Sequence, residues 1–484
     1  MMTTDRPPIQ PIQTRYKLQL LSDEELDHMQ DATLKILEKV GVLFPSKQAL
    51  SIFADAGAEV DFKTQIVRLA PELVFEALSH VPRYFNLGAR DPACNLTLQP
   101  GTSYFTNDGC GVETVELESG NRRPSRKDDV AMMAHISDYL SSIAFVWPMV
   151  SAQDYGETAP LHELDAAWNH TVKHVQSETI MGARLARRAL EMGLVMAGDR
   201  ETLRAHPPFS LLVCTIAPLT QDKDGIEGAL VLAAAGIPVG FMAMPTLGTT
   251  APATLAGAFA MADAESVSAA VLMQLASPGA PVFHSLLQAY ADPRSGAYVG
   301  YPLNVRTRYA SIELAHHWGI PTLGGAFGTD SRTPGTWQAA AEVALDPLLV
   351  SLAGSELVTG IGLNQTYTVL YPEAIILDDD LYHRARHALQ GLDISEETLA
   401  LDTIQSVGPG GHFLAQKHTR KHMRDSMQPA VTHQMDPQGG YRDALQVARE
   451  RARWILDNYE PEPLEKAKQT ELTRILEAAG KEFS

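Results

Sequence analysis

The strongest fold signal in the sequence is IPVGFMAMPTLGTTAPATLAGAFAMADAESVSAAVLMQLASPGAPVFHSLLQA, residues 237–289. Two short apolar runs, 237–245 and 280–289, flank a longer alanine-rich segment, 254–277. The short runs have the length and apolar character of buried strands, and the longer segment has the length of a helix. The stretch therefore predicts two parallel strands joined by a right-handed helical crossover.

The same alternation of short apolar runs and alanine-rich segments recurs through the middle of the chain. Seven runs predict strands at 142–150, 170–177, 209–218, 237–245, 280–289, 320–330 and 355–363, and an eighth lies near 103–107. The predicted helices between them include 159–169, 254–277 and 336–354. Eight strands favour a closed (β/α)8 TIM barrel over an open doubly wound sheet. No G-x-G-x-x-G motif follows the first strand to favour a dinucleotide-binding fold.

Three regions are expected from this pattern. Residues 1–100 are expected to form an N-terminal arm and helices that pack on the barrel, and residues 101–365 the barrel core. Residues 366–484 are expected to form a helical region that completes and caps the barrel. The first helix should begin after Ser22, because serine is a good N-cap and acidic residues follow it, and should end at Gly41.

Composition narrows the class of protein further. The formal net charge is −19, so binding to nucleic acid is not expected. The most apolar stretch, 228–248, contains glycine and proline and predicts a helix followed by a buried strand, so no membrane span is expected. Three widely spaced cysteines, Cys94, Cys110 and Cys214, form neither a disulfide framework nor a CxxC pair. Because the polar start also lacks the apolar core of a signal peptide, the expected location is the cytoplasm.

Four separated motifs carry a family resemblance. They are TAPATLAGAFAMADAESVSAAVLMQLASPGAPVFHS (250–285), ADPRSGAYVGYP (291–302), GIPTLGGAFGTDSRTPGTWQAAAE (319–342) and VGPGGHFLAQKHT (407–419). In this order they resemble the trimethylamine:corrinoid methyltransferase (MttB-like) family, and the resemblance covers nearly the whole chain. It implies a TIM barrel that moves a methyl group from a methylated amine to Co(I) of a cobalamin-type corrinoid. It also implies a partner, the small corrinoid-binding protein that carries this cofactor.

The resemblance points to the pyrrolysine-free branch of the family, because every residue of the chain is a standard amino acid. Members of that branch demethylate quaternary amines such as glycine betaine, which sets the expected substrate class. A quaternary ammonium releases a neutral tertiary amine without needing a proton. Attack by Co(I) also destroys charge, which a dry, low-dielectric pocket favours. Desolvation, aromatic enclosure and in-line positioning would suffice, so no metal ion bound by the chain itself is expected.

Functional side chains of a TIM barrel lie at the C-terminal ends of the strands. By this rule the predicted catalytic residues are Asp330 and His284. The predicted substrate-binding residues are Tyr104, Asn107, Asp108, Trp147, Gln288, Tyr301 and Phe327. For Asp330, orienting the substrate or supporting the site is favoured, because direct pairing with the cation would stabilise the ground state. Structural alternatives stay open: Asp330 could cap a helix, His284 could be a bonded core histidine, and the aromatic rings could be core packing.

The stretch GPGGHFLAQKHTRKHMR, residues 408–424, concentrates histidine and basic residues. His418 and His422 are four apart but lack the H-E-x-x-H pattern, so a metal site is disfavoured. The glycines could cradle an anion, and the basic side chains could form a docking surface or an ordinary solvated helix face. The favoured interpretation is a loop beside the barrel mouth that contacts the corrinoid through Gly410, Gly411, His412 and His418. The docking surface for the carrier protein would comprise Lys417, Arg420, Lys421 and Arg424.

Alternatives to the leading function remain at this point. A barrel that kept the fold but lost the chemistry would act in binding or regulation, and its mouth would be filled. The same reaction could also act on a carnitine-like or proline-betaine-like compound. A homo-oligomer is expected for a barrel of this size.

Overall fold

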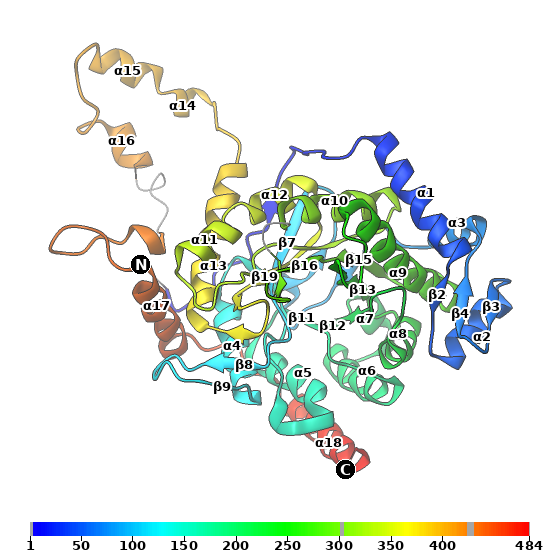
Figure 1. Cartoon of the computed structure of the whole chain (residues 1–484). Coiled ribbons are helices and arrows are strands. Elements are labelled where there is room, and N and C mark those ends of the chain that lie inside the picture. The colour runs from blue at the N-terminus through cyan, green and yellow to red at the C-terminus, as the bar shows by residue number, and fades with distance from the viewer. Residues whose placement is uncertain (1–2, 301–303, 424–429, 484) are drawn as a thin grey trace.

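The computed structural model of the chain describes residues 3–300, 304–423 and 430–483. Its centre is a parallel barrel surrounded by helices (Figure 1). The barrel strands are β7 (Thr102–Asn107), β10 (Ile143–Val146), β11 (His174–Ser177), β12 (Phe209–Cys214), β13 (Val239–Ala243), β15 (Val282–Leu286), β18 (Leu323–Gly325) and β19 (Leu357–Ile361). They pair in parallel in the order β15–β13–β12–β11–β10–β7–β19–β18, and a parallel bridge between His284 and Thr322 joins the two ends. The predicted (β/α)8 barrel is confirmed.

The helices of the outer layer follow the strands in the expected alternation. They include α4 (Lys127–Tyr139), α5 (Ala159–His170), α6 (Ala183–Ala197), α8 (Lys223–Ala234), α9 (Leu255–Ala276), α10 (Asn304–His317), α12 (Asp346–Ala353) and α13 (Pro372–Leu389). Helix α9 has no separate polar face because it is covered on both sides, and its acidic residues Asp263 and Glu265 are buried too. Its inner side packs on β13 and β15, and its outer side on α1 (Asp23–Lys39), α2 (Lys47–Asp55) and α3 (Pro71–Leu78).

Helix α9 is also the one helix, among the residues that the structure describes, with the length and hydropathy of a membrane span. The chain itself buries 83% of that segment, which is typical of a core helix. Helix α1 begins as predicted, with a capping box at Ser22. The Ser22 hydroxyl accepts from the Glu25 amide, and the Glu25 carboxylate accepts from the Ser22 amide at 2.8 Å.

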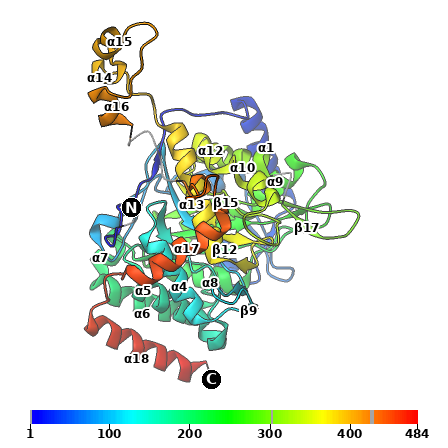
Figure 2. The ribbon, with the colours of Figure 1, turned by 90° about the vertical axis from the view of Figure 1, so that its left-hand side faces the viewer.

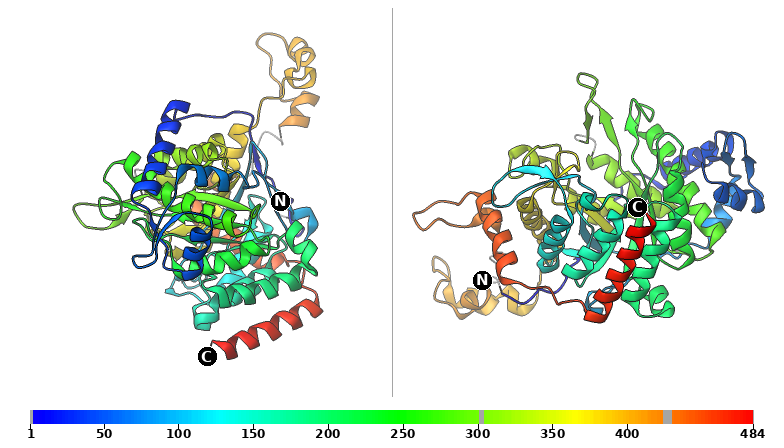
Figure 3. Two further views of the ribbon diagram at one scale, coloured as in Figure 1. Left: turned by 90° about the vertical axis from the view of Figure 1, so that its right-hand side faces the viewer. Right: turned by 90° about the horizontal axis from the view of Figure 1, so that it is seen from below.

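The C-terminal helices lie on the flank of the barrel. Helix α17 (Ala444–Asn458) packs on α13 and α4, and α18 (Lys466–Glu482) packs on α6 and α5. Figure 3 shows α18 lying along the outside of the outer helices, well separated from the N-terminal helices on the opposite flank.

The N-terminal end of the barrel is closed by packing. The hairpin of β5 (Asn86–Leu87) and β6 (Leu96–Thr97) is tied to the segments that precede β11 and β12. The Gly88 amide donates to Pro207 O at 2.8 Å, and the Asp91 amide donates to Val172 O at 3.1 Å. Apolar side chains from this hairpin and from the strands fill the interior above it. As far as the structure describes the chain, the interior is therefore open to a ligand from the C-terminal end.

Phe283 is part of this filling, and its position depends on a glycine in the neighbouring strand. A Cβ atom at Gly240 would lie 1.9 Å from the Phe283 ring, so only glycine allows the two strands to pair with this ring between them.

Two small sheets rim the C-terminal mouth. One consists of β14 (Thr246–Leu247), β16 (Ala289–Ala291) and β17 (Tyr298–Val299). The other consists of β20 (Leu363–Asn364), β21 (Val369–Leu370), β8 (Glu113–Val115) and β9 (Arg122–Pro124). Because each follows a barrel strand, the residues in their turns face the open end of the barrel.

Residues 391–423 form a projecting segment that leaves the body of the molecule after α13 (Figures 1 and 2). It contains α14 (Glu396–Leu399), α15 (Leu401–Val407) and α16 (Lys417–His422), and none of the residues in these helices is buried. In Figure 2 the segment lies at the upper left, whereas β17 lies on the opposite side of the molecule.

Candidate functional site

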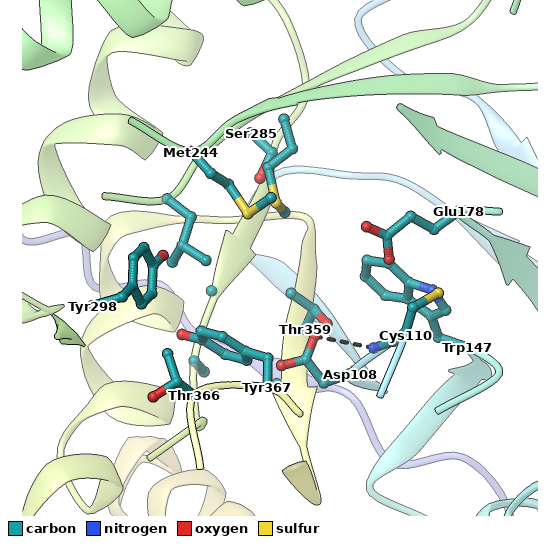
Figure 4. Close-up of a pocket in the computed structure, with 16 residues that line it drawn as sticks. Asp108, Cys110, Trp147, Glu178, Met244, Ser285, Tyr298, Thr359, Thr366 and Tyr367 are labelled. Carbon is teal, nitrogen blue, oxygen red and sulfur yellow. Dashed lines mark hydrogen bonds between the residues drawn. The ribbon is translucent and has the colours of Figure 1, made fainter. Parts of the chain in front are cut away.

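A cavity of about 360 Å³ lies at the C-terminal end of the barrel (Figure 4). Every element that contributes to its wall is a strand end or a turn that follows one. The lining residues are Asp108, Gly109, Cys110, Trp147, Glu178, Met242, Met244, Ser285, Leu287, Tyr298, Gly325, Ala326, Thr359, Gly360, Thr366 and Tyr367. The cavity thus occupies the position at which TIM barrels place their active sites.

Three aromatic rings stand around the cavity. Trp147 follows β10, Tyr298 begins β17, and Tyr367 lies in the turn between β20 and β21. The indole of Trp147 fits because residue 109 is glycine: a Cβ atom there would lie 2.1 Å from Trp147 Nε1. The Trp147 indole N–H is buried and has no hydrogen-bond partner among the described residues.

Tyr367 is held by an unusual turn. Gln365, Thr366 and Tyr367 all have positive φ, at 51°, 55° and 65°. Left-handed backbone is costly for residues with a Cβ atom, and such strain concentrates at functional sites. Gly328 provides the space for the ring, since a Cβ atom there would lie 2.5 Å from Tyr367 Cε1.

Two carboxyl groups, from the buried Asp108 and the half-buried Glu178, face the same cavity (Figure 4). Asp108 is the first residue after β7; its Oδ1 accepts from the Gly109 amide at 3.1 Å, and its Oδ2 has no partner among the described residues. Burial and the negative charge of Glu178 raise the pKa of Asp108 to about 7. Burial likewise raises the pKa of Glu178, although hydrogen bonds from Cys214 and Cys110 partly oppose this.

The two thiols beside Glu178 are kept protonated. The Cys214 Sγ lies 3.2 Å from Glu178 Oε1. Burial and the adjacent Glu178 raise the pKa of both Cys110 and Cys214 well above the usual value of a thiol. A thiol with a raised pKa is a poor nucleophile, so neither cysteine is suited to covalent catalysis at neutral pH. Within the described parts of the chain, no group of three or more His, Cys, Asp or Glu side chains is arranged to hold a metal ion.

Basic side chains are absent from this lining, as far as the structure describes the chain. Arg308 lies behind the wall, close enough to lower the pKa of Asp108 and of Tyr367. Its charge is paired, because Nη1 lies 2.7 Å from Asp346 Oδ2, and Nη2 donates to Phe327 O at 2.8 Å. Nε and Nη1 have no hydrogen-bond partner among the described residues. The site therefore combines aromatic faces and acids, which suits a cation.

Of the residues predicted from the sequence for substrate binding, Asp108 and Trp147 line the cavity. Tyr104 points toward the closed end, where its hydroxyl donates to Thr97 O at 3.1 Å. Asn107 Nδ2 donates to Ser137 Oγ at 2.8 Å on α4.

Three further predicted substrate-binding residues lie elsewhere. Phe327 is fully buried against Phe105, with ring centroids 6.2 Å apart. Gln288 is buried just after β15 and does not line the cavity. Tyr301 lies outside the described residues.

The two predicted catalytic residues lie outside the cavity wall. His284 Nε2 is 2.9 Å from Asp263 Oδ1 on α9, and Asp263 Oδ2 accepts from Thr33 and Trp318. His284 thus links β15 to the outer helices. Asp330 instead connects two loops of the mouth, because it accepts from the Gly300 amide and from Thr366 Oγ1, each at 3.1 Å.

The stretch 408–424 lies away from the mouth, contrary to the sequence-based expectation. Helix α13 carries the chain back toward the N-terminal end of the barrel, where Leu389 and Gly391 share a surface groove with Thr102, the first residue of β7. The predicted corrinoid-contacting residues Gly410, Gly411, His412 and His418 follow in the projecting segment, and none lines the cavity. The glycines and histidines of this stretch do not indicate the direction in which the preceding helix, α13, runs. Arg424 lies outside the described residues.

The sequence patterns did not identify Glu178, Tyr298 and Tyr367 as residues of the cavity. Glu178 is the first residue after β11, so the rule of strand ends would have found it if applied one residue further. Tyr298 and Tyr367 belong to the small sheets of the mouth, whose turns depend on tertiary contacts rather than on local pattern.

Comparison with known proteins places the chain among methylamine methyltransferases. A family model described as Trimethylamine methyltransferase (MTTB) matches residues 3–482. The trimethylamine methyltransferase MttB of Desulfitobacterium hafniense (strain DSM 10664 / DCB-2) is 32% identical over 468 residues, covering 96% of this chain and 94% of the relative. A glycine betaine methyltransferase of D. hafniense strain Y51 is 29% identical over 474 residues, covering 96% and 98%. The crystal structure of the Methanosarcina barkeri monomethylamine methyltransferase MtmB superimposes with a TM-score of 0.54 over 93% of this chain and 91% of that chain; at 12% identity it supports the fold alone.

Proposed function

The chain belongs to the trimethylamine methyltransferase (MTTB) family, and we propose that it moves a methyl group from a quaternary amine to Co(I) of a corrinoid carried by a partner protein. The observation that carries this proposal is the cavity at the mouth of the barrel. Its closed inner end, three aromatic rings and two carboxyls form an enclosure for a cation of small size. The relative named glycine betaine methyltransferase supports the quaternary class of amine.

The dimensions of the cavity fit an acceptor that approaches from outside. A space of about 360 Å³ accommodates a trimethylammonium compound, and it lies at the mouth of the barrel. The inner end of the barrel is filled, so the methyl group must leave through the mouth. Both points support a corrinoid that stays on a separate protein and supplies a Co(I) nucleophile at the rim.

The residues of this chain would bind, orient and desolvate the amine. The faces of Trp147, Tyr298 and Tyr367 would contact the methylated ammonium, and the carboxyls of Asp108 and Glu178 would balance its charge. In the transfer the C–N bond breaks and its electron pair remains on nitrogen, so the amine leaves neutral and needs no proton. The positive charge of the amine is lost in this step, which favours the dry cavity over water.

Two alternatives differ from this proposal in what they require. A non-catalytic binding barrel would be expected to have a filled mouth, whereas this barrel has an open space lined by aromatic rings and acids. The same reaction on a carnitine-like or proline-betaine-like compound would use the same residues and differ only in the substituent of the amine.

We also propose that the projecting segment mediates contact between copies of this chain. Its helices bury no residue, and Leu392, Leu401 and Leu414 are 92%, 66% and 79% exposed. Apolar side chains gathered on a segment without a core are typical of an association surface. An acidic carrier protein is a weaker candidate here, because Lys421 pairs with Glu397 inside the segment.

The function is tested by mixing the chain with reduced cob(I)alamin and a panel of trimethylammonium compounds, with and without a corrinoid protein of this family. Formation of methylcobalamin is followed by absorbance, and the demethylated amine by mass spectrometry. Glycine betaine, carnitine, proline betaine and choline form the panel. If none of them yields methylcobalamin even with corrinoid protein present, the proposed function is wrong.

A further inference from the structure

We infer that the cavity accepts a quaternary amine of net positive charge, a trimethylammonium compound whose remaining substituent is neutral, and discriminates against zwitterionic betaines. This inference rests on the proposed function and names the substrate class of the same site. It follows from which charged and polar groups face the cavity and from which of them are already engaged.

The charges on the wall are all of one sign. Asp108 and Glu178 are the ionisable acids of the lining, and no lysine, arginine or histidine of the described residues joins them. The buried cation behind the wall, Arg308, forms an ion pair with Asp346 at 2.7 Å. A betaine carboxylate would therefore enter a buried space with two acids and no free cation, and burying an unpaired charge is strongly unfavourable.

The hydroxyl groups of the wall offer no substitute for a cation: the serine and threonine hydroxyls are engaged within the protein, and those of Tyr298 and Tyr367 are neutral donors that do not balance the charge of a carboxylate. Ser285 donates to Leu323 O at 2.7 Å, and Thr359 donates to Asn107 O at 2.8 Å. Thr366 donates to Asp330 Oδ1 at 3.1 Å. Each of these hydroxyl protons is used within the protein, so none is free to stabilise a substrate carboxylate.

Two buried polar atoms of the wall do lack partners among the described residues, and they suit a neutral polar group. Above pH 7, where Asp108 is ionised, its Oδ2 is an acceptor, and Trp147 Nε1 is a donor. Buried polar atoms without partners are rare and point to a missing ligand. A hydroxyl can donate to one such atom and accept from another, whereas a carboxylate can only accept and would face the oxygen of Asp108.

Titration of the wall provides a signature of cation binding. Asp108 has a pKa of about 7, and it is surrounded by Glu178, Arg308, Asp378 and Tyr367. A bound cation favours the ionised form of Asp108, so binding near pH 7 should release a proton to the buffer. A neutral or zwitterionic ligand of the same shape lacks this net charge and should release far less.

The test is calorimetric titration of the full chain, without corrinoid, with three probes of similar shape: choline, glycine betaine and 3,3-dimethylbutan-1-ol. The last replaces the ammonium nitrogen of choline by carbon. Choline is expected to bind at least ten-fold more tightly than either of the others at pH 8. At pH 7 its heat of binding should vary with the ionisation enthalpy of the buffer, which measures the released proton.

Variants assign the effect to the two acids. Asp108→Asn and Glu178→Gln are each expected to weaken choline binding at least ten-fold and to narrow the ratio between choline and glycine betaine. The control is Glu157→Gln, which removes an exposed acid outside the lining and should leave both affinities unchanged. Circular dichroism establishes whether each variant is folded. If a variant is not folded, the ratio of the choline and glycine betaine affinities of the wild type decides whether the inference holds.

Glycine betaine binding as tightly as choline, or no binding of either, would overturn the inference. An unchanged ratio in both folded variants would do the same. The outcome is separable from that of the proposed function: methyl transfer from glycine betaine but not from choline would sustain the function and overturn the inference.

Discussion

Asp330 accepts a hydrogen bond from Thr366 at 3.1 Å and so connects the two loops that carry the tyrosines of the cavity. On its other side it accepts from the Gly300 amide, two residues after Tyr298. Thr366 immediately precedes Tyr367. The carboxylate therefore bonds to both loops without lying in the wall, and we propose that it is a positioning residue, the supporting role that the sequence favoured for it.

Replacing Asp330 should loosen the site more than the fold. Asp330→Ala removes hydrogen bonds worth about 1–3 kcal/mol in total, and we expect KM for the amine to rise about ten-fold while Tm falls only slightly. Asp330→Asn keeps the geometry of the acceptor and should recover part of the affinity. The measurements are steady-state kinetics and thermal melting. Unchanged kinetics in the alanine variant would remove Asp330 from the site.

Ionisation of Asp108 should lower the free energy of unfolding at neutral and alkaline pH. Its pKa is raised from 3.8 to about 7, so the folded state binds more protons than the unfolded state between these values. Its contribution to stability is full below pH 4 and is lost as pH rises through 7. Because each ten-fold change in the acid dissociation constant corresponds to about 1.36 kcal/mol, the free energy of unfolding lost in this way is at most about 4 kcal/mol.

The variant Asp108→Asn removes that ionisable group, so it should be more stable than the wild type at pH 8, and this advantage should shrink at pH 5, because most of the loss occurs between pH 5 and 7. Thermal melting of both proteins at the two pH values is the measurement. Because the other ionisable groups are common to both proteins, their contributions largely cancel in the comparison. If the difference in Tm between variant and wild type is the same at both pH values, the pKa of Asp108 is not raised in the folded protein.

The sequence predicts the barrel well because the fold depends on local patterns. The runs around 237–245 and 280–289 are strands β13 and β15, and the segment between them is α9. Strand ends also identified Asp108 and Trp147. The pattern does not show on which side of the strand a polar side chain points. Asn107, one residue before Asp108, was therefore predicted to bind substrate, but it faces Ser137 on α4 instead of the cavity.

His284 illustrates the same limit. Its strand is certain from the pattern, but the partner that engages its ring, Asp263, lies twenty-one residues earlier, on α9. The projecting segment illustrates a second limit of prediction from sequence. Composition identified a stretch rich in basic residues at 408–424, but the distance of this stretch from the mouth depends on the path of α13. Contacts between distant parts of the chain determine both.

The projecting segment should control association. We expect the double variant Leu401→Glu/Leu414→Glu to shift the chain toward monomer, because charges on these exposed positions oppose apolar contact between copies without disturbing a core. Size-exclusion chromatography with light scattering gives the mass. Ser406→Glu, which adds a charge to an exposed polar position of the same segment, is the matched control. A monomeric wild type, or a double variant with the wild-type mass, would contradict this assignment.

Gly109 should be required for the shape of the cavity. A Cβ atom at this position would lie 2.1 Å from Nε1 and 2.4 Å from Cδ1 of Trp147, so either the indole or the loop must move. Overpacking of this kind costs about 1–3 kcal/mol, and we expect Gly109→Ala to weaken binding of the amine at least ten-fold with a modest fall in Tm. Trp147→Phe removes the part of the ring that clashes, so the double variant Gly109→Ala/Trp147→Phe should lose less affinity than the sum of the two single changes. Calorimetric titration of the three variants with the preferred amine measures this coupling, and additive losses would mean that the two residues act independently.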